Sequence, residues 1–236
     1  SNRMNYDGGM HVSELPERTQ DYLKILWNHE EKTGSDAAMP LGDLAKAAGQ
    51  KLPTTSEAVK RLAAKGLVEH ERYFGVRLVR EGRELAVAMV RRHRLLETFL
   101  VRTLGYTWDE VHEEAEMLEH ATSDRFVERI DAFLGAPARD PHGDPIPAAD
   151  GTAEPLSRIT LADVPPNSPV TMEQVNDADG EFLRYLDKHG VRPGVRLTVV
   201  APPVAGLLEV SVDGGASFSL GESAAREIAV CDVEGG

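Results

Sequence analysis

The chain has 236 residues, of which 41% are apolar and 28% are charged, a composition typical of a folded protein with two or three compact units. It contains no run of about 18 apolar residues and no basic segment followed by an apolar one near its start, so we expect a cytoplasmic protein without a membrane partner. The net charge of −13 argues against nucleic-acid binding by the chain as a whole, and the single cysteine, Cys231, excludes an intrachain disulfide framework and a cysteine-pair zinc finger.

A winged helix-turn-helix domain is predicted for residues 11–80. It follows a polar, aperiodic segment, 1–10, which we interpret as a disordered N-terminus or a tag. Apolar residues recur at helical spacing three times, and the pattern then alternates as in a two-stranded hairpin. The expected elements are helices over 13–34, 41–48 and 53–66 and a hairpin centred on 73–75.

Basic residues are concentrated in this part of the chain. Residues 46–94 contain twelve Lys or Arg against five Asp or Glu, whereas the segments before and after them are acidic. A basic block in an acidic chain indicates either a local contact with a polyanion or a solvated face, and the charge alone does not decide between them.

Helical periodicity continues through residues 81–150, which we predict to form a helical dimerisation and metal-binding domain. Its expected helices cover 82–104, 108–120 and 123–134. Their long apolar faces predict a helix-to-helix contact in a homodimer.

The C-terminal part changes to short β-strand signals. Residues 135–155 are rich in Pro, Gly, Asp and Ala and form either a linker or an ordered, turn-rich connection, with 151–160 as the linker in our domain division. Strands are expected over 169–175, 195–201, 207–212 and 228–233, with a helix near 182–189. The predicted fold is therefore mainly α with small β parts, ending in an SH3-like β-barrel over 161–236.

One helix carries a stripe of four possible metal ligands. His112, Glu116, Glu119 and His120 stand at i, i+4, i+7 and i+8, which places them on one face of a helix. His93 and Glu97 form a similar pair one helix earlier. Solvated charges are the alternative interpretation. The spacing fits no zinc-protease motif, because Glu116 stands where a histidine is required.

These runs resemble a known family. The residues from Arg91 to Glu97 and from Val111 to His120 are similar to the metal-binding core of the diphtheria toxin repressor family. The resemblance extends to Leu52–Val59, to Pro145–Pro147 and to the SH3-like module, and covers about residues 12 to 233.

The resemblance implies two metal sites in each subunit. The primary site would use Asp21, Glu116, Glu119 and His120. The ancillary site would use His93, Glu97 and His112, completed by Glu173 and Asn176 from the SH3-like domain. The family has Glu and Gln at the spacing of the last pair, and the segment from Glu173 to Gly190 is one residue longer here.

The departures from the family pattern point to manganese. Iron-responsive members resemble the chain but have Met where Asp21 stands and Cys where Glu116 stands. Hard oxygen donors suit Mn(II), whereas sulfur favours softer ions, so we expect Mn(II), with Fe(II), Co(II) and Zn(II) as ions that the same donors could bind in vitro. Lys24 stands where two-domain manganese regulators carry a glutamate.

A repressor of this type would bind a palindromic, double-stranded operator as a homodimer, with metal ordering its DNA-binding domain. The residues expected to contact bases or phosphates are Lys51, Thr54, Thr55, Ser56, Glu57, Lys60, Arg61, Arg72 and Arg77. Thr54 and Ser56 could instead only cap their helix.

Three alternatives remain at this stage. The first is an iron-dependent repressor of the same fold, and the second is a winged-helix sensor of a non-metal ligand. A metal-dependent hydrolase is the third, although no nucleophile elbow or phosphate loop is present, and we expect no enzyme activity. His11, His29, His70, His142 and His189 receive no role.

Overall fold

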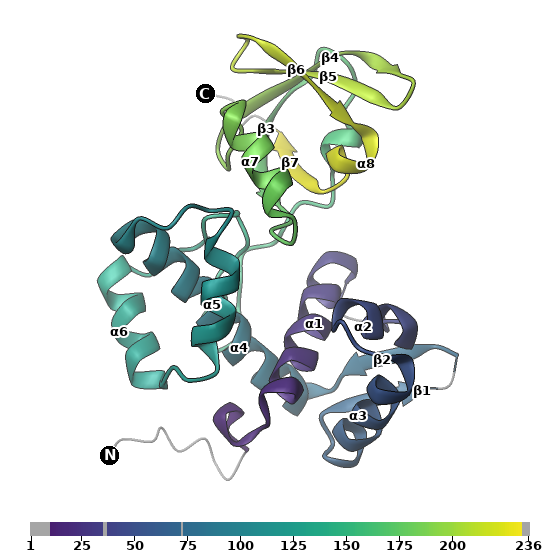
Figure 1. Ribbon diagram of the computed structural model, residues 1–236, viewed down its shortest axis with the longest axis vertical. Coiled ribbons are helices and arrows are strands. Elements are labelled where there is room, and N and C mark those ends of the chain that lie inside the picture. The colour runs from purple at the N-terminus through teal and green to yellow at the C-terminus, as the bar shows by residue number, and fades with distance from the viewer. Residues whose placement is uncertain (1–9, 35–36, 72, 233–236) are drawn as a thin grey trace. The chain divides into compact units, whose positions relative to one another are not determined.

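The structure is a computed structural model that describes residues 10–34, 37–71 and 73–232. The chain divides into two compact units, whose helices and strands are labelled in Figure 1. The first comprises residues 1–93, 119–122 and 147–152, and the second comprises 94–118, 123–146 and 153–236. Residues 1–10, expected to be a disordered N-terminus or a tag, lie outside the described residues except for residue 10.

The first unit is helical with a two-stranded wing. Its elements are η1 (Val12–Glu14), α1 (Glu17–Thr33), α2 (Leu41–Ala47), α3 (Leu52–Ala64), β1 (Val68–Glu71), β2 (Gly75–Leu78) and the start of α4 (Arg80–Phe99). Strands β1 and β2 pair antiparallel, from Val68 opposite Leu78 to Glu71 opposite Gly75. A buried apolar cluster that includes Leu23, Leu44 and Val59 holds the three helices and the wing together.

Local sequence explains where these helices begin and end. Pro16 and Pro40 precede α1 and α2, and Pro53 lies in the first turn of α3, where its missing N–H is not needed. Gly34, with φ of 109°, ends α1 and donates its backbone N–H to the Glu30 carbonyl.

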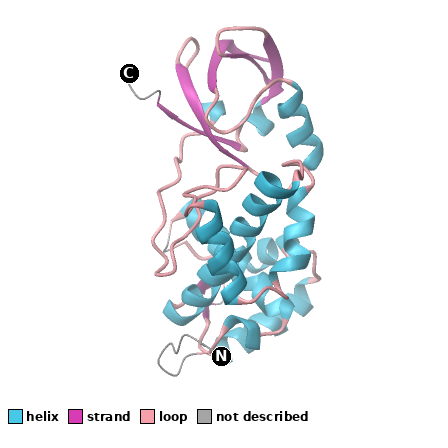
Figure 2. Cartoon of the chain, turned by 90° about the vertical axis from the view of Figure 1, so that its left-hand side faces the viewer, coloured by secondary structure: helices cyan, strands magenta, loops and turns pink. Residues whose placement is uncertain are grey.

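The second unit combines helices with a β-sheet (Figure 2). Its helical elements are the end of α4, a π-helical turn η2 (Leu100–Leu104), α5 (Val111–Glu119), α6 (Asp124–Leu134), η3 (Leu161–Asp163), α7 (Gly180–Lys188) and α8 (Glu222–Ala225). The last residue of α5, Glu119, belongs to the first unit. The strands are β3 (Pro169–Val175), β4 (Arg196–Val204), β5 (Leu207–Val212), β6 (Ser217–Gly221) and β7 (Ile228–Asp232). The five strands form one antiparallel sheet in the order β6-β5-β4-β3-β7.

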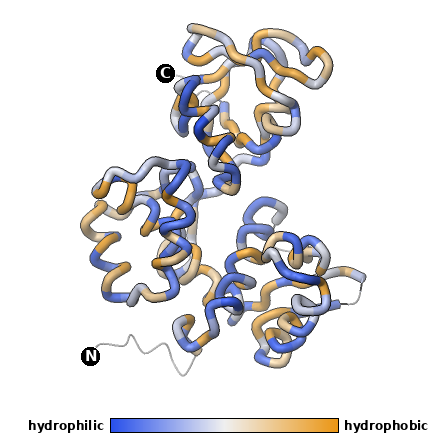
Figure 3. Tube along the Cα trace, viewed as in Figure 1, coloured by the Kyte–Doolittle hydropathy of each residue, from blue (hydrophilic) through white to orange (hydrophobic). Residues whose placement is uncertain are grey.

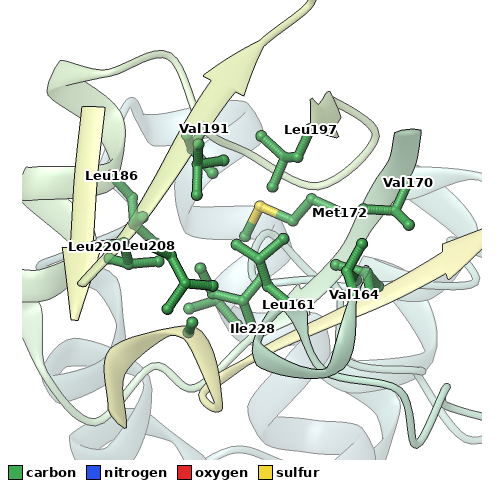
Figure 4. Close-up of a cluster of buried hydrophobic side chains, with 14 of the residues drawn as sticks. Leu161, Val164, Val170, Met172, Leu186, Val191, Leu197, Leu208, Leu220 and Ile228 are labelled. Carbon is green, nitrogen blue, oxygen red and sulfur yellow. The ribbon is translucent and has the colours of Figure 1, made fainter. Parts of the chain in front are cut away.

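Two apolar cores stabilise this unit. A helical core includes Leu95, Val111 and Ile130, which follows from the alternation of hydrophobic and hydrophilic residues along these helices (Figure 3). The sheet packs against a second core, part of which is drawn in Figure 4. Trp108, 1% exposed, belongs to this second core although it precedes α5.

The predicted fold class is confirmed, and most elements lie where the sequence places them. Helix α5 begins at Val111 rather than at Trp108, because the Trp108 side chain is buried in the sheet core. Strand β6 and helix α8 were not predicted. Of the two interpretations of residues 135–155, the ordered connection is correct for 138–147, where the chain turns and is largely buried.

That turn docks against β3. The Val175 N–H donates to the His142 carbonyl at 3.0 Å, and a Cβ atom on Gly143 (φ of 93°) would lie 2.0 Å from the Glu173 carbonyl oxygen. Only glycine allows this approach.

None of the described helices is long and apolar enough to span a membrane.

We predict that Gly82→Ala destabilises the first unit by about 1 to 3 kcal/mol, because the added methyl group would overlap backbone atoms. A Cβ atom there would lie 1.9 Å from the Leu67 carbonyl oxygen. Gly42→Ala in α2 is the control, since nothing lies within 4 Å of its Cβ position and alanine favours the helix. Thermal unfolding measures both, and equal stabilities would contradict this packing.

Candidate functional site

Helix α3 presents a polar face to solvent. Lys51, just before the helix, and Thr54, Glu57, Lys60 and Arg61 are exposed. Ser56, also expected to face DNA, is half-buried. Lys60 donates to Glu57 at 2.7 Å, and this hydrogen bond lowers the pKa of the Glu57 carboxyl. Most of the expected DNA-contacting residues are thus accessible.

Three of the expected contacts need separate comment. Thr55 is fully buried, and its hydroxyl lies 3.3 Å from the Tyr22 hydroxyl, so the structure does not place it on the exposed face. Arg77 in β2 is engaged by Glu69 at 2.6 Å across the wing. Arg72 lies outside the described residues.

Asp21, Glu119 and His120 come together in the first unit, and we call them the primary cluster. Each offers one ligand atom, and these atoms lie within 4.8 Å of one another. The His120 Nε2 atom is 3.2 Å from Asp21 Oδ1 and 3.8 Å from Glu119 Oε1. Helix α1 supplies Asp21, α5 ends at Glu119, and His120 follows directly after it.

Glu119 is fully buried and is held by two further groups. The Lys24 ammonium donates to its Oε1 at 2.7 Å, and its Oε2 lies 2.5 Å from His93 Nδ1. Burial raises the pKa of the Glu119 carboxyl, but the hydrogen bond and charge of His93 and the charge of Lys24 outweigh it and lower the pKa. His93 thus contacts Glu119, and its role at the ancillary site stays a prediction.

Glu116, expected at the primary site, stands one turn before Glu119 on α5. Its side chain is 51% exposed, and its Oε1 lies 3.5 Å from His112 Nε2. Glu116 belongs to the second unit, and it is not among the residues grouped with Asp21.

Glu97, His112 and Asp177 come together in the second unit, with ligand atoms within 4.8 Å of one another. His112 Nδ1 is 2.9 Å from Asp177 Oδ2 and 3.3 Å from Glu97 Oε1. Burial lowers the pKa of His112, but hydrogen bonds to Asp177, Glu116 and Glu97 outweigh it and raise the pKa to about 12. This imidazole is the counter-charge of the surrounding carboxylates.

Asp140 and His142 extend this group from the docked turn. Glu97, Asp140 and His142 offer ligand atoms within 4.8 Å of one another, and all three are buried. His142 Nε2 lies 2.6 Å from the Trp108 carbonyl, so it must donate there. His142 Nδ1 is 3.5 Å from Glu97 Oε2 and has no hydrogen-bond partner among the described residues. We call Glu97, His112, Asp140, His142 and Asp177 the inner cluster.

Burial alone would shift the pKa values of Asp140 and His142 in opposite directions. It raises the pKa of Asp140 well above its ordinary value, and Asp144 and Glu97 add to this. It lowers the pKa of His142, but the ion-pair contact with Glu97 at 3.5 Å outweighs it and raises the pKa to about 10. A cation at this point would relieve the repulsion between the carboxylates.

Glu173 and Asn176 are not part of the inner cluster. The Glu173 carboxylate accepts from Arg139 at 2.7 Å and from the Ser157 N–H at 2.8 Å. Asn176 donates to Glu227 at 2.8 Å, and its side-chain oxygen accepts from the Ala178 N–H. The next residue, Asp177, reaches His112 instead.

Sequence reasoning missed Asp140, His142 and Asp177. The extra residue between Glu173 and Gly190 was a signal for Asp177, since an insertion shifts which side chain reaches the site. The signal for Asp140 and His142 was weaker. It was the presence of acidic and imidazole groups in a turn rich in Pro and Gly.

The donors of both clusters are carboxylate oxygens and imidazole nitrogens. Neither cluster contains a sulfur donor. The cysteine of the chain, Cys231, lies in β7, where its Sγ is 3.8 Å from the Thr171 carbonyl. Such donor sets bind divalent ions on the hard side of the first-row series. The buried Nδ1 of His142, which lacks a hydrogen-bond partner among the described residues, also fits a ligand role.

Three segments match known families. Residues 14–76 match the family described as iron dependent repressor, N-terminal DNA binding domain, and 80–148 match its metal binding and dimerisation domain. Residues 159–231 match the FeoA domain. The iron-dependent repressor IdeR of Mycobacterium leprae (strain TN) is 31% identical, and the alignment covers 93% of this chain and 99% of that protein. The chain belongs to the iron-dependent repressor family.

Solved structures agree with this membership. A manganese-dependent transcriptional repressor in complex with manganese is 46% identical, with a TM-score of 0.84, covering 91% of this chain and 100% of that one. The manganese regulator SloR is 33% identical, with a TM-score of 0.76 and coverage of 93% and 100%. As a member of this family, the chain is a metal-dependent transcriptional repressor with a DNA-binding domain, a metal-binding and dimerisation domain and an SH3-like FeoA domain.

Proposed function

We propose that the chain is a manganese-dependent repressor that binds a palindromic operator as a homodimer in the cytoplasm and has no enzyme activity. The observation that carries the proposal is the donor chemistry at Asp21 and Glu116. These are the two positions where iron-responsive relatives resemble the chain but carry sulfur ligands, and carboxylates favour Mn(II).

Asp21, Glu119 and His120 would hold one ion, and the family resemblance adds Glu116 to this set of ligands. Glu97, His112, Asp140, His142 and Asp177 would supply the donors of a second ion, with His93 as a further donor. A divalent ion would supply positive charge to the carboxylates of the primary cluster and of the inner cluster. To bind it, His112 and His142 must lose the protons that their raised pKa values retain, so binding would release protons.

Helix α1 connects the primary cluster to the DNA-binding face. Tyr22 follows Asp21 on α1, and its hydroxyl contacts Thr55, which is buried on α3. Holding Asp21 would therefore restrain α1 and, through Tyr22, the orientation of α3. Metal binding and DNA binding would then favour the same arrangement, and each would strengthen the other by the same factor.

The exposed face of α3 would enter the major groove, with Thr54 and Glu57 facing the bases. Lys51, Lys60 and Arg61 would contact phosphates, Ser56 would have a lesser part, and Arg72 and Arg77 of the wing would add charge. Exposed apolar residues of the second unit are candidates for the dimer contact, namely Leu104, Met117, Phe126 and Phe133.

We expect Mn(II) to strengthen operator binding about 5- to 150-fold, which corresponds to a coupling of about 1 to 3 kcal/mol. The probe is a duplex selected from a random library by Mn(II)-loaded protein, and fluorescence anisotropy measures its affinity with Mn(II) and with chelator. Asp21→Ala should lose the enhancement, whereas Asp43→Ala, an exposed aspartate of α2, should keep it. Equal affinity in chelator and in Mn(II) would refute the mechanism.

Ligand softness gives a second prediction. Glu116→Cys should shift activation toward Fe(II) and Co(II) at buffered free-metal concentrations, because a thiolate favours later ions. Glu113→Cys, at an exposed position on the same helix, is the control for an added thiol. If wild type responds to Fe(II) as strongly as to Mn(II), the iron-dependent alternative is correct.

The inner cluster gives a third prediction. Asp177→Asn should lower the number of Mn(II) ions bound or weaken the second binding step, measured by metal analysis and calorimetry. Asn176→Ala should leave that step nearly unchanged, because the Asn176 side chain is engaged by Glu227. The reverse pattern would favour the ligand pair expected from the family resemblance.

A further inference from the structure

Gln20, the residue before Asp21 on α1, uses both ends of its side chain. It is buried, with 2% exposure. Its Nε2 atom donates to the Leu15 carbonyl at 2.8 Å, and its Oε1 atom lies 3.0 Å from His120 Nδ1. Leu15 is itself fixed at the end of η1, where its N–H donates to the Val12 carbonyl.

This arrangement determines the role of each ring nitrogen of His120. A carbonyl oxygen can only accept, so the amide nitrogen of Gln20 must face Leu15 and the amide oxygen must face His120. An amide oxygen also only accepts, so Nδ1 of His120 must carry the proton. The remaining nitrogen, Nε2, faces Asp21 and Glu119.

Consecutive residues of α1 therefore address the two nitrogens of one ring. Side chains that follow one another on a helix diverge by about 100°, which allows Gln20 to reach Nδ1 while Asp21 lies on the Nε2 side. The turn at Leu15 prevents Gln20 from rotating away, because the Leu15 carbonyl would lose its buried partner.

We propose that Gln20 is a positioning residue of the primary cluster, which fixes the His120 tautomer and ring orientation so that Nε2 is presented to a divalent ion. This inference rests on the proposed metal-binding function of that cluster. A hydrogen bond to the distal nitrogen of a ligating histidine orients the ring and raises its basicity, and its loss weakens metal binding by about 10- to 100-fold.

The amide also suits this place better than a carboxylate. It accepts from His120 and donates to Leu15 at once, whereas a carboxylate could only accept and would face the Leu15 carbonyl unfavourably. It adds no negative charge beside Asp21 and Glu119. These differences allow the two effects of Gln20 to be separated by substitution.

The test compares Gln20→Leu with Gln20→Glu in an Asp177→Asn background, so that ions in the inner cluster do not mask losses at the primary one. Leucine removes both hydrogen bonds, whereas glutamate keeps the acceptor for His120 and loses the donor to Leu15. Gln50→Leu, at a half-buried glutamine between α2 and α3, is the control for the same chemical change elsewhere in the unit.

We expect Gln20→Leu to bind Mn(II) about 10- to 100-fold more weakly, measured by electron paramagnetic resonance of free Mn(II), and Gln50→Leu to be unchanged. Gln20→Glu should recover the affinity without recovering the melting temperature of the metal-free protein. A merely structural role predicts that affinity follows stability in both variants. Equal losses in the two variants, or no loss in either, would overturn the proposal.

Nitrogen NMR of His120 separates this inference from the function on which it rests. The expected spectrum has a protonated Nδ1 in metal-free wild type and, with diamagnetic Zn(II) as the probe, a metal-bound Nε2. An unprotonated Nδ1 in wild type would contradict the role of Gln20 alone. Wild type that binds neither Mn(II) nor Zn(II) at this cluster would contradict the proposed function, and with it any part that Gln20 has in metal binding.

Discussion

A carboxylate that is completely removed from water must be compensated by positive charge, and Glu119 and Glu97 both face this requirement. Lys24 and His93 compensate Glu119, while His112 and His142 compensate Glu97. Removing one partner of a buried ion pair costs about 3 to 5 kcal/mol. Lys24 and the three histidines therefore supply the positive charge that these two buried carboxylates require.

The inner cluster depends on a turn that is held by backbone contacts. Gly143 allows the chain to approach β3 closely, and this contact brings Asp140 and His142 to Glu97. The ion pair between Arg139 and Glu173 connects the start of the turn to the same strand. Glu173, expected to bind metal, thus supports the segment that carries other candidate ligands.

The periodic spacing of residues predicted helices and strands, but it could not predict the positions of residues in irregular turns. The helices α1 to α7 and four of the five sheet strands follow from regular apolar spacing, and the stripe on α5 led to the primary cluster. The same spacing placed Thr55 in line with Ala58, Val59 and Leu62, so its burial could have been foreseen. His142 and Asp140 occupy a turn without any period, and Asp177 depends on a shift of one residue, so their positions required the folded chain.

Trp108 has a consequence for how the chain can be divided. Its indole is buried in the core of the SH3-like domain, the Arg192 guanidinium lies 4.7 Å from the ring centre, and its carbonyl accepts from His142. The segment that leads into α5 is therefore also part of the C-terminal domain. That domain is not a detachable module: cutting the chain before residue 160 would leave an indole without its apolar surroundings.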